Sequence, residues 1–145
     1  MQSFRLLAVL FAASICQISV AQTLTTCETE PTTAQTNECM VKALERSERE
    51  MERYFKAAVE RMKGQSSTDT DLFATQMKWL EYRRAHCADV YDMWRQGTYR
   101  HSRSAACHLK LTTERTHDIW SAYLTHIDST PPVLPEPLLH TGQPR

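Results

Sequence analysis

The sequence has little glycine, no net charge and no long apolar run, and each shortage excludes a class of protein. Only three glycines occur, and the alternating apolar and polar runs of strands are absent, so we expect an all-α fold. The 17 basic and 17 acidic residues balance, which argues against nucleic acid or a membrane surface as the partner. No apolar run reaches the about 20 residues of a transmembrane helix, so we expect no stable membrane insertion.

The sequence also lacks the patterns that catalysis and cofactor binding require. It has no glycine-rich phosphate loop, no Ser/His/Asp arrangement and no acidic pair typical of an active site. Glu114 and His117 form a single E-x-x-H motif, whereas di-iron bundles use two such motifs and two further glutamates. We therefore expect no enzyme activity, no cofactor and no metal site.

The first 21 residues have the pattern of a secretory signal peptide. Arg5 supplies the positive charge, residues 6–13 are apolar, and residues 19–21 end in Ala21 with small residues at both positions that a signal peptidase reads. Cys16 is a weaker candidate for a lipoprotein cysteine, because the branched Ile15 precedes it. We predict cleavage near Ala21 and a mature protein that is periplasmic or secreted.

Four cysteines remain in the mature chain, namely Cys27, Cys39, Cys87 and Cys107. An even number in a small exported domain predicts two disulfides, and the absence of a C-x-x-C motif disfavours a zinc site. Gly97 lies ten positions from both Cys87 and Cys107, so an antiparallel helix pair that turns at Gly97 would bring them together. This favours Cys87–Cys107 and Cys27–Cys39, although two other pairings are formally possible.

Hydrophobic periodicity predicts three helices that form an antiparallel bundle within a domain at residues 22–127. The first helix covers residues 33–63, with Thr32 and Gln35 as a capping box. Its charged residues 45–53 are interpreted as a solvated face with pairs such as Glu45–Arg49. The second helix covers residues 69–95 with Thr68 as its cap, and the third runs from residue 102 or 104 to residue 126.

Residues 76–87 are the expected centre of this bundle, on a strongly amphipathic second helix. The bulk of its apolar stripe is expected from Met77, Trp79, Leu80, Val90, Tyr91 and Trp94. By contrast, residues 128–145 contain five of the six prolines and little periodicity, which predicts a disordered, partly polyproline tail.

The second helix resembles the LprI-type lysozyme inhibitor family of small exported bacterial proteins. The family pattern is roughly Gln-x-x-Trp-x-x-Tyr/Phe-Arg-Asp-x-x-Cys, and the chain fills it with Gln76, Trp79, Tyr82, Arg83 and Cys87. Arg84 departs from the pattern, because it stands where Asp is usual. Further matches include two of the other cysteines and residues near them: Thr32, Asn37, Cys39, Leu44, Cys107, Thr112, Arg115 and Ile119. Thr36 replaces the usual Met, and the resemblance covers residues 27–126.

The resemblance implies a protein that binds and inhibits lysozyme, but it carries over no binding motif. We interpret Gln76, Trp79, Tyr82, Arg83, Thr112 and Arg115 as structural residues. A buried guanidinium needs carboxylate or carbonyl partners, and Glu81 and Glu114 are candidates for Arg83 and Arg115. The expected partner is a protein, with a lysozyme-like muramidase first. The alternative is an envelope structural or interaction module that binds another exported protein and has no lysozyme affinity.

Overall fold

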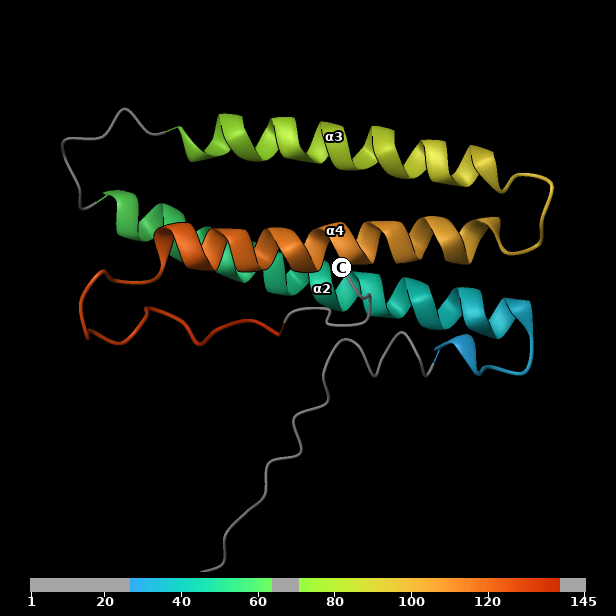
Figure 1. Ribbon diagram of the computed structural model, residues 1–145, viewed down its shortest axis with the longest axis horizontal. Coiled ribbons are helices and arrows are strands. Elements are labelled where there is room, and N and C mark those ends of the chain that lie inside the picture. Colours follow the sequence, from blue (N-terminus) through green and yellow to red (C-terminus); the bar gives the residue numbers. More distant parts are fainter. Residues whose placement is uncertain (1–26, 64–70, 139–145) are drawn as a thin grey trace, which may run out of the picture.

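Three helices form the part of the chain that the computed structural model describes, residues 27–63 and 71–138. They are α2 (Thr33–Lys63), α3 (Leu72–Met93) and α4 (Arg100–Tyr123), and no strand occurs between or beside them in these two segments (Figure 1). The predictions of an all-α fold and of two disulfides are confirmed. None of the helices in the described segments is long and apolar enough to cross a membrane. The predicted signal peptide lies outside these segments.

Capping residues explain where α2 and α3 begin. The Thr32 hydroxyl oxygen accepts from the Gln35 backbone N–H at 3.2 Å, so α2 begins where the capping box predicted. α3 begins three residues later than predicted, because Asp71 is its N-cap and accepts from the Ala74 backbone N–H at 2.8 Å. The predicted cap Thr68 lies outside the described residues. α4 begins earlier than predicted, at Arg100, after a turn in which the Gly97 N–H donates to the Trp94 carbonyl at 2.8 Å.

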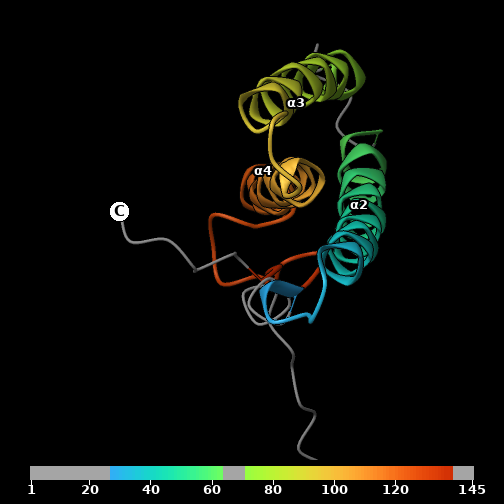
Figure 2. The same cartoon turned by 90° about the vertical axis from the view of Figure 1, so that its right-hand side faces the viewer.

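The helix α4 occupies the middle of the structure. α3 runs in the opposite direction to both α2 and α4, and an end-on view places α4 between the other two helices (Figures 1 and 2). The main core cluster lies mostly between α2 and α4, with one residue from the start of α3, and contains Met51, Tyr54, Ala58, Leu72, Ile119 and Leu124. Burying a large apolar side chain stabilises the fold by about 1.5–3 kcal/mol, so this interface supplies much of the hydrophobic driving force.

α3 is less buried than the sequence predicted. Its buried residues are Leu72, Gln76 and Cys87, whereas Met77 is 56% exposed and Trp94, which follows the helix, is 46% exposed. The expectation that both belong to the core stripe is therefore wrong. The physical reason is that α3 packs mainly against α4 alone, which leaves most of its circumference facing solvent. Trp79, Leu80, Val90 and Tyr91 are half-buried along the contact.

Residues 128–138 form a C-terminal strap that returns along α2 and α4, and this corrects the prediction of a disordered tail for that stretch. The Val133 N–H donates to the Leu124 carbonyl at 2.8 Å, and the Trp120 ring N–H donates to the Leu134 carbonyl at 2.9 Å. The Tyr54 hydroxyl donates to the Pro135 carbonyl at 2.7 Å. Proline-rich segments keep every carbonyl acceptor, so side-chain donors can hold them without periodic secondary structure. Residues 139–145 lie outside the described residues.

Candidate functional site

Both disulfides form as predicted, and both lie toward the same end of the helices. Cys27 pairs with Cys39, and Cys87 pairs with Cys107, with Cα–Cα distances of 5.5 and 5.7 Å. Cys39 lies about two turns after α2 begins, Cys87 about two turns before α3 ends, and Cys107 about two turns after α4 begins. Because α3 is antiparallel to its neighbours, these three positions share one end (Figure 1).

Arg83 joins all three helices through its guanidinium group. Its Nη1 donates to the Thr112 hydroxyl of α4 at 2.6 Å and lies 2.9 Å from the Glu48 carboxylate of α2. The Arg83 side chain is 13% exposed and that of Glu48 is 41% exposed, so the arginine is shielded from water and the carboxylate is partly solvated. Glu48 was not among the expected partners of Arg83. The candidates Glu81 and Glu114 form no ion pair with Arg83, and the Glu114 carboxylate lies 3.9 Å from the Lys110 Nζ instead.

Gln76, Trp79 and Arg115 extend this polar contact along the α3–α4 interface. The Arg115 Nε donates to the Gln76 side-chain oxygen at 3.1 Å, and the Gln76 amide donates to the Met51 sulfur at 3.6 Å. The centroid of the Trp79 ring lies 5.1 Å from the Arg83 guanidinium carbon and 5.9 Å from that of Arg115. Five of the six motif residues therefore contact one another between helices.

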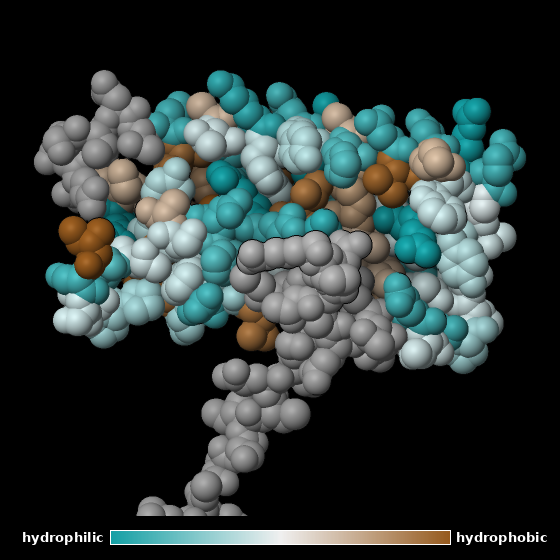
Figure 3. Space-filling view, viewed as in Figure 1, coloured by the Kyte–Doolittle hydropathy of each residue, from teal (hydrophilic) through white to brown (hydrophobic). Residues whose placement is uncertain are grey.

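Tyr82 is the motif residue that stands apart from this interface. Its side chain is 54% exposed, and its ring stacks on His86 with the two ring centroids 5.7 Å apart. The two residues lie on the outward face of α3. Across the face shown in Figure 3, hydrophobic side chains are scattered among hydrophilic ones.

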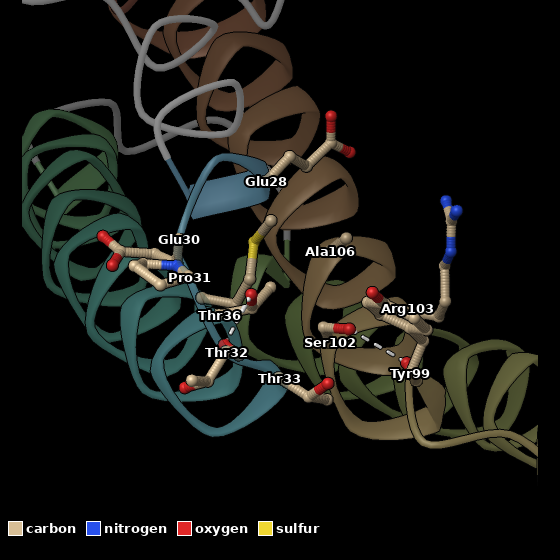
Figure 4. A pocket seen from close by; sticks show the side chains of 11 residues that line it. Glu28, Glu30, Pro31, Thr32, Thr33, Thr36, Tyr99, Ser102, Arg103 and Ala106 are labelled. Atoms are coloured by element: carbon tan, nitrogen blue, oxygen red, sulfur yellow. Dashed lines mark hydrogen bonds between the residues drawn. The ribbon is translucent and has the colours of Figure 1, made fainter.

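An open cleft of about 590 Å³ lies at the disulfide-bearing end. Its walls come from the arm before α2, from the first turns of α2 and from the start of α4 (Figure 4). Glu28, Thr32 and Thr36 line one side, and Tyr99 and Arg103 line the other. Figure 4 shows the Arg103 guanidinium extending away from the threonines. The cleft is open, and both polar and apolar side chains line it.

Aromatic and arginine side chains gather beside this cleft, where α3 turns into α4. We define the hairpin end by six residues: Met93, Trp94, Arg95, Tyr99, Arg100 and Arg103. Met93 is 84% exposed, Tyr99 54% and Trp94 46%. The Arg103 guanidinium lies 5.1 Å from the Trp94 ring centroid, and that of Arg100 lies 5.6 Å from the Tyr91 ring centroid. These contacts order the arginines while their charges stay accessible.

The charges at the hairpin end are not neutralised within the part of the chain that the structure describes. None of its three guanidinium groups forms an ion pair with a carboxylate there, whereas four glutamates of α2 pair with lysine or arginine within the helix, namely Glu38, Glu50, Glu52 and Glu60. The predicted pair Glu45–Arg49 is not among the ion pairs of this segment. The solvated charged face of α2 therefore balances itself, and the hairpin end keeps a positive charge.

His108 lies near the Arg83–Glu48 pair, and the charges of that pair affect the pKa of its imidazole. Burial lowers the pKa of the His108 imidazole below its ordinary value of 6.5, the Arg83 charge lowers this pKa further, and Glu48 opposes the shift. No set of three or more His, Cys, Asp or Glu side chains within residues 27–63 and 71–138 is placed to hold a metal. In the E-x-x-H motif, His117 contacts Glu136 of the strap at 3.2 Å.

The hairpin end was not predicted from the sequence, although the local charge of residues 93–113 indicates it. Residues 93–113 contain no acidic residue, while they contain four basic residues and two histidines. A balanced total charge hid this local excess.

The chain is similar to a known protein family. The sequence model of the family described as Lysozyme inhibitor LprI matches residues 26–119. The matched region includes all four cysteines of both disulfides and all six motif residues. Searches of curated proteins and of solved structures gave no match.

Proposed function

Since the chain belongs to the LprI lysozyme inhibitor family, we propose that it is an exported protein that binds a lysozyme-like muramidase and occludes its active-site cleft. The observation that carries this proposal is the extent of the family match, which runs from residue 26 to residue 119. It covers α2, α3 and most of α4, so the likeness concerns the whole helical scaffold.

Export is supported by the two disulfides and by the signal-like residues 1–21. Disulfides persist in oxidising compartments such as the periplasm and the extracellular space. A protein released there meets muramidases that attack the cell wall. The proposal therefore places the mature chain, from near residue 22, in the periplasm or outside the cell.

Inhibition by occlusion follows from how muramidases work. Glycoside hydrolysis uses two carboxyl groups on either side of the scissile bond, in a cleft that must admit a polysaccharide. A rigid protein surface that fills the cleft blocks substrate without any chemistry of its own. Two disulfides at one end of the helices give such a rigid surface, because groups that are already ordered lose less entropy on binding.

The test is inhibition by the purified, disulfide-bonded mature chain. Muramidase activity on cell walls is measured with lysozymes of several structural types, at inhibitor ratios around one to one. Cleft occlusion predicts a raised KM with little change in kcat, since substrate and inhibitor compete for one site. Calorimetry or a sizing column then detects the complex.

Absence of both inhibition and complex formation with every lysozyme type would overturn the proposal. In that case the envelope interaction module becomes the better hypothesis. A pull-down from envelope extract, run beside a lysozyme column, tests that alternative directly.

A further inference from the structure

We propose that the hairpin end is the surface that enters the carboxylate-bearing cleft of the muramidase. This inference rests on the proposed function and specifies which face of the molecule performs it. The hairpin end lies at one extreme of the long axis, the same end at which α2 begins (Figure 1).

Charge complementarity is the first argument. A muramidase cleft carries a pair of carboxyl groups, and Arg95, Arg100 and Arg103 offer three guanidinium groups that no carboxylate of the described residues neutralises. Guanidinium groups bind carboxylates through two parallel hydrogen bonds, which makes them suited to this contact. No acidic residue occurs within residues 93–113, although Glu28 and Glu30 line the same cleft as Arg103.

The second argument is the type of side chain around the arginines. Trp94 and Tyr99 are about half exposed, and Met93 is 84% exposed. Tryptophan, tyrosine and arginine are the residues that most often carry the binding energy of protein interfaces. The hairpin end therefore combines apolar area with charge in one small surface.

The turn between α3 and α4 is conformationally ordered before it binds a partner. The Cys87–Cys107 bond closes the hairpin about two turns from its tip, and the Ser104 hydroxyl donates to the Cys87 carbonyl at 3.1 Å. At the tip itself, the Arg100 Nη1 donates to the Arg95 carbonyl at 3.1 Å. A turn held this way loses little conformational freedom when it binds, which favours affinity.

The acidic arm beside the hairpin end fits the same partner. Glu28 and Glu30 line the adjacent cleft and form no ion pair among the described residues. Lysozymes are typically basic outside their catalytic cleft, so these two carboxylates would face positive charge while the arginines face the catalytic carboxyl groups. The end of the molecule thus carries both signs of charge on opposite walls of one cleft, which can fix the orientation of the complex.

The experiment compares two charge reversals of equal size in the mature chain. The double variant Arg95→Glu/Arg103→Glu changes the hairpin end, and Arg46→Glu/Arg49→Glu changes two exposed arginines of α2 by the same amount. We expect the hairpin variant to inhibit about 100-fold more weakly than wild type, and the α2 variant to stay within about threefold. Circular dichroism and melting temperature establish that each variant is folded, and the single variant Arg95→Glu replaces the double one if that is unstable.

A competition measurement adds an independent readout. An N-acetylglucosamine oligosaccharide that occupies the muramidase cleft should displace the wild-type chain. The inference is overturned if wild type inhibits and the hairpin variants inhibit equally well, if the α2 variant loses as much, or if the oligosaccharide and the chain bind together. A wild-type chain that binds no muramidase overturns the proposed function itself, so the two failures are distinguishable.

Discussion

The helices α3 and α4 are neighbours of similar length, yet they are held in different ways. α4 buries residues along its whole length: Ser102, Ala105, Leu109, Thr112, Thr113, Thr116 and Ile119. α3 buries Leu72, Gln76 and Cys87 only, and it is attached by a disulfide and by directed polar bonds from Arg83 and Arg115. Apolar burial is non-directional, whereas a covalent bond and charged hydrogen bonds fix position. The comparison indicates that α4 supplies stability and that α3 is kept in register.

The largest change in the free energy of unfolding should come from a substitution in the buried face of α4. Ile119 of α4 is 1% exposed, whereas Met77 of α3 is 56% exposed. Ile119→Ala should lower the free energy of unfolding by about 2–5 kcal/mol, because it removes buried methyl groups and leaves a cavity. Met77→Ala should change it by less than about 0.5 kcal/mol. Urea unfolding measures both, and similar values for the two variants would contradict the contrast between the helices.

Removing the disulfide between α3 and α4 should have the next largest effect. In Cys87→Ala/Cys107→Ala, the loss of a cross-link that spans 20 positions should cost about 3 kcal/mol on the chain-entropy relation. Because α3 has few apolar contacts, amide hydrogen exchange should rise mainly in α3. The matched control Cys27→Ala/Cys39→Ala should leave exchange in α3 unchanged. An equal rise in α4 would show that the disulfide does not hold α3 specifically.

A smaller effect is expected from the polar attachment. Arg83→Met keeps most of the aliphatic stem but removes the bonds to Thr112 and Glu48, so it should cost about 1.5–3 kcal/mol. The neighbouring Arg84 is exposed, and Arg84→Met should change the free energy of unfolding by less than about 0.5 kcal/mol. Denaturant titration distinguishes the two variants. If Arg83→Met were as neutral as the control, the polar network would contribute nothing measurable to the attachment.

The smallest effect is a pH dependence of stability that results from the titration of His108. Its pKa is lowered in the folded protein, by burial and then by Arg83, so the unfolded chain binds more protons as the pH falls below about 6.5. The contribution of His108 to stability is therefore fully present above that pH and decreases toward acid. His108→Gln should show a smaller loss of melting temperature between about pH 7.5 and pH 5 than wild type. An unchanged loss would contradict the assignment.

Local signals in the sequence were sufficient to predict the start of α2 at its cap and the pairing of Cys87 with Cys107 across the turn. Thr32 and Gln35 determine where α2 begins through bonds within four residues, so the sequence pattern is sufficient. Cys87 and Cys107 are equally far from Gly97 in the sequence, and residues equally far from the turn face each other in any antiparallel helix pair. Both predictions needed no knowledge of a third element.

The predictions that failed required knowledge of which helices pack against one another. Met77 and Trp94 fit an apolar pattern, but the number of neighbours of α3 decides whether that pattern is buried. The partner of Arg83 is Glu48, which lies 35 positions earlier in the sequence on another helix. The hairpin end likewise depends on a fold that places residues 93–103 at one extreme and leaves their charges unpaired.

The C-terminal strap is held by its backbone, and this affects how much its sequence can change. Tyr54 and Trp120 donate to the carbonyls of Pro135 and Leu134, and burial raises the pKa of the Tyr54 hydroxyl above its ordinary value of 10.0, so it stays a donor at neutral pH. Every amino acid has that carbonyl. Substituting Pro135 would leave both acceptors in place, and the strap can therefore accumulate substitutions while it remains docked. Sequence comparison would then find little to align there, even where the structure is the same.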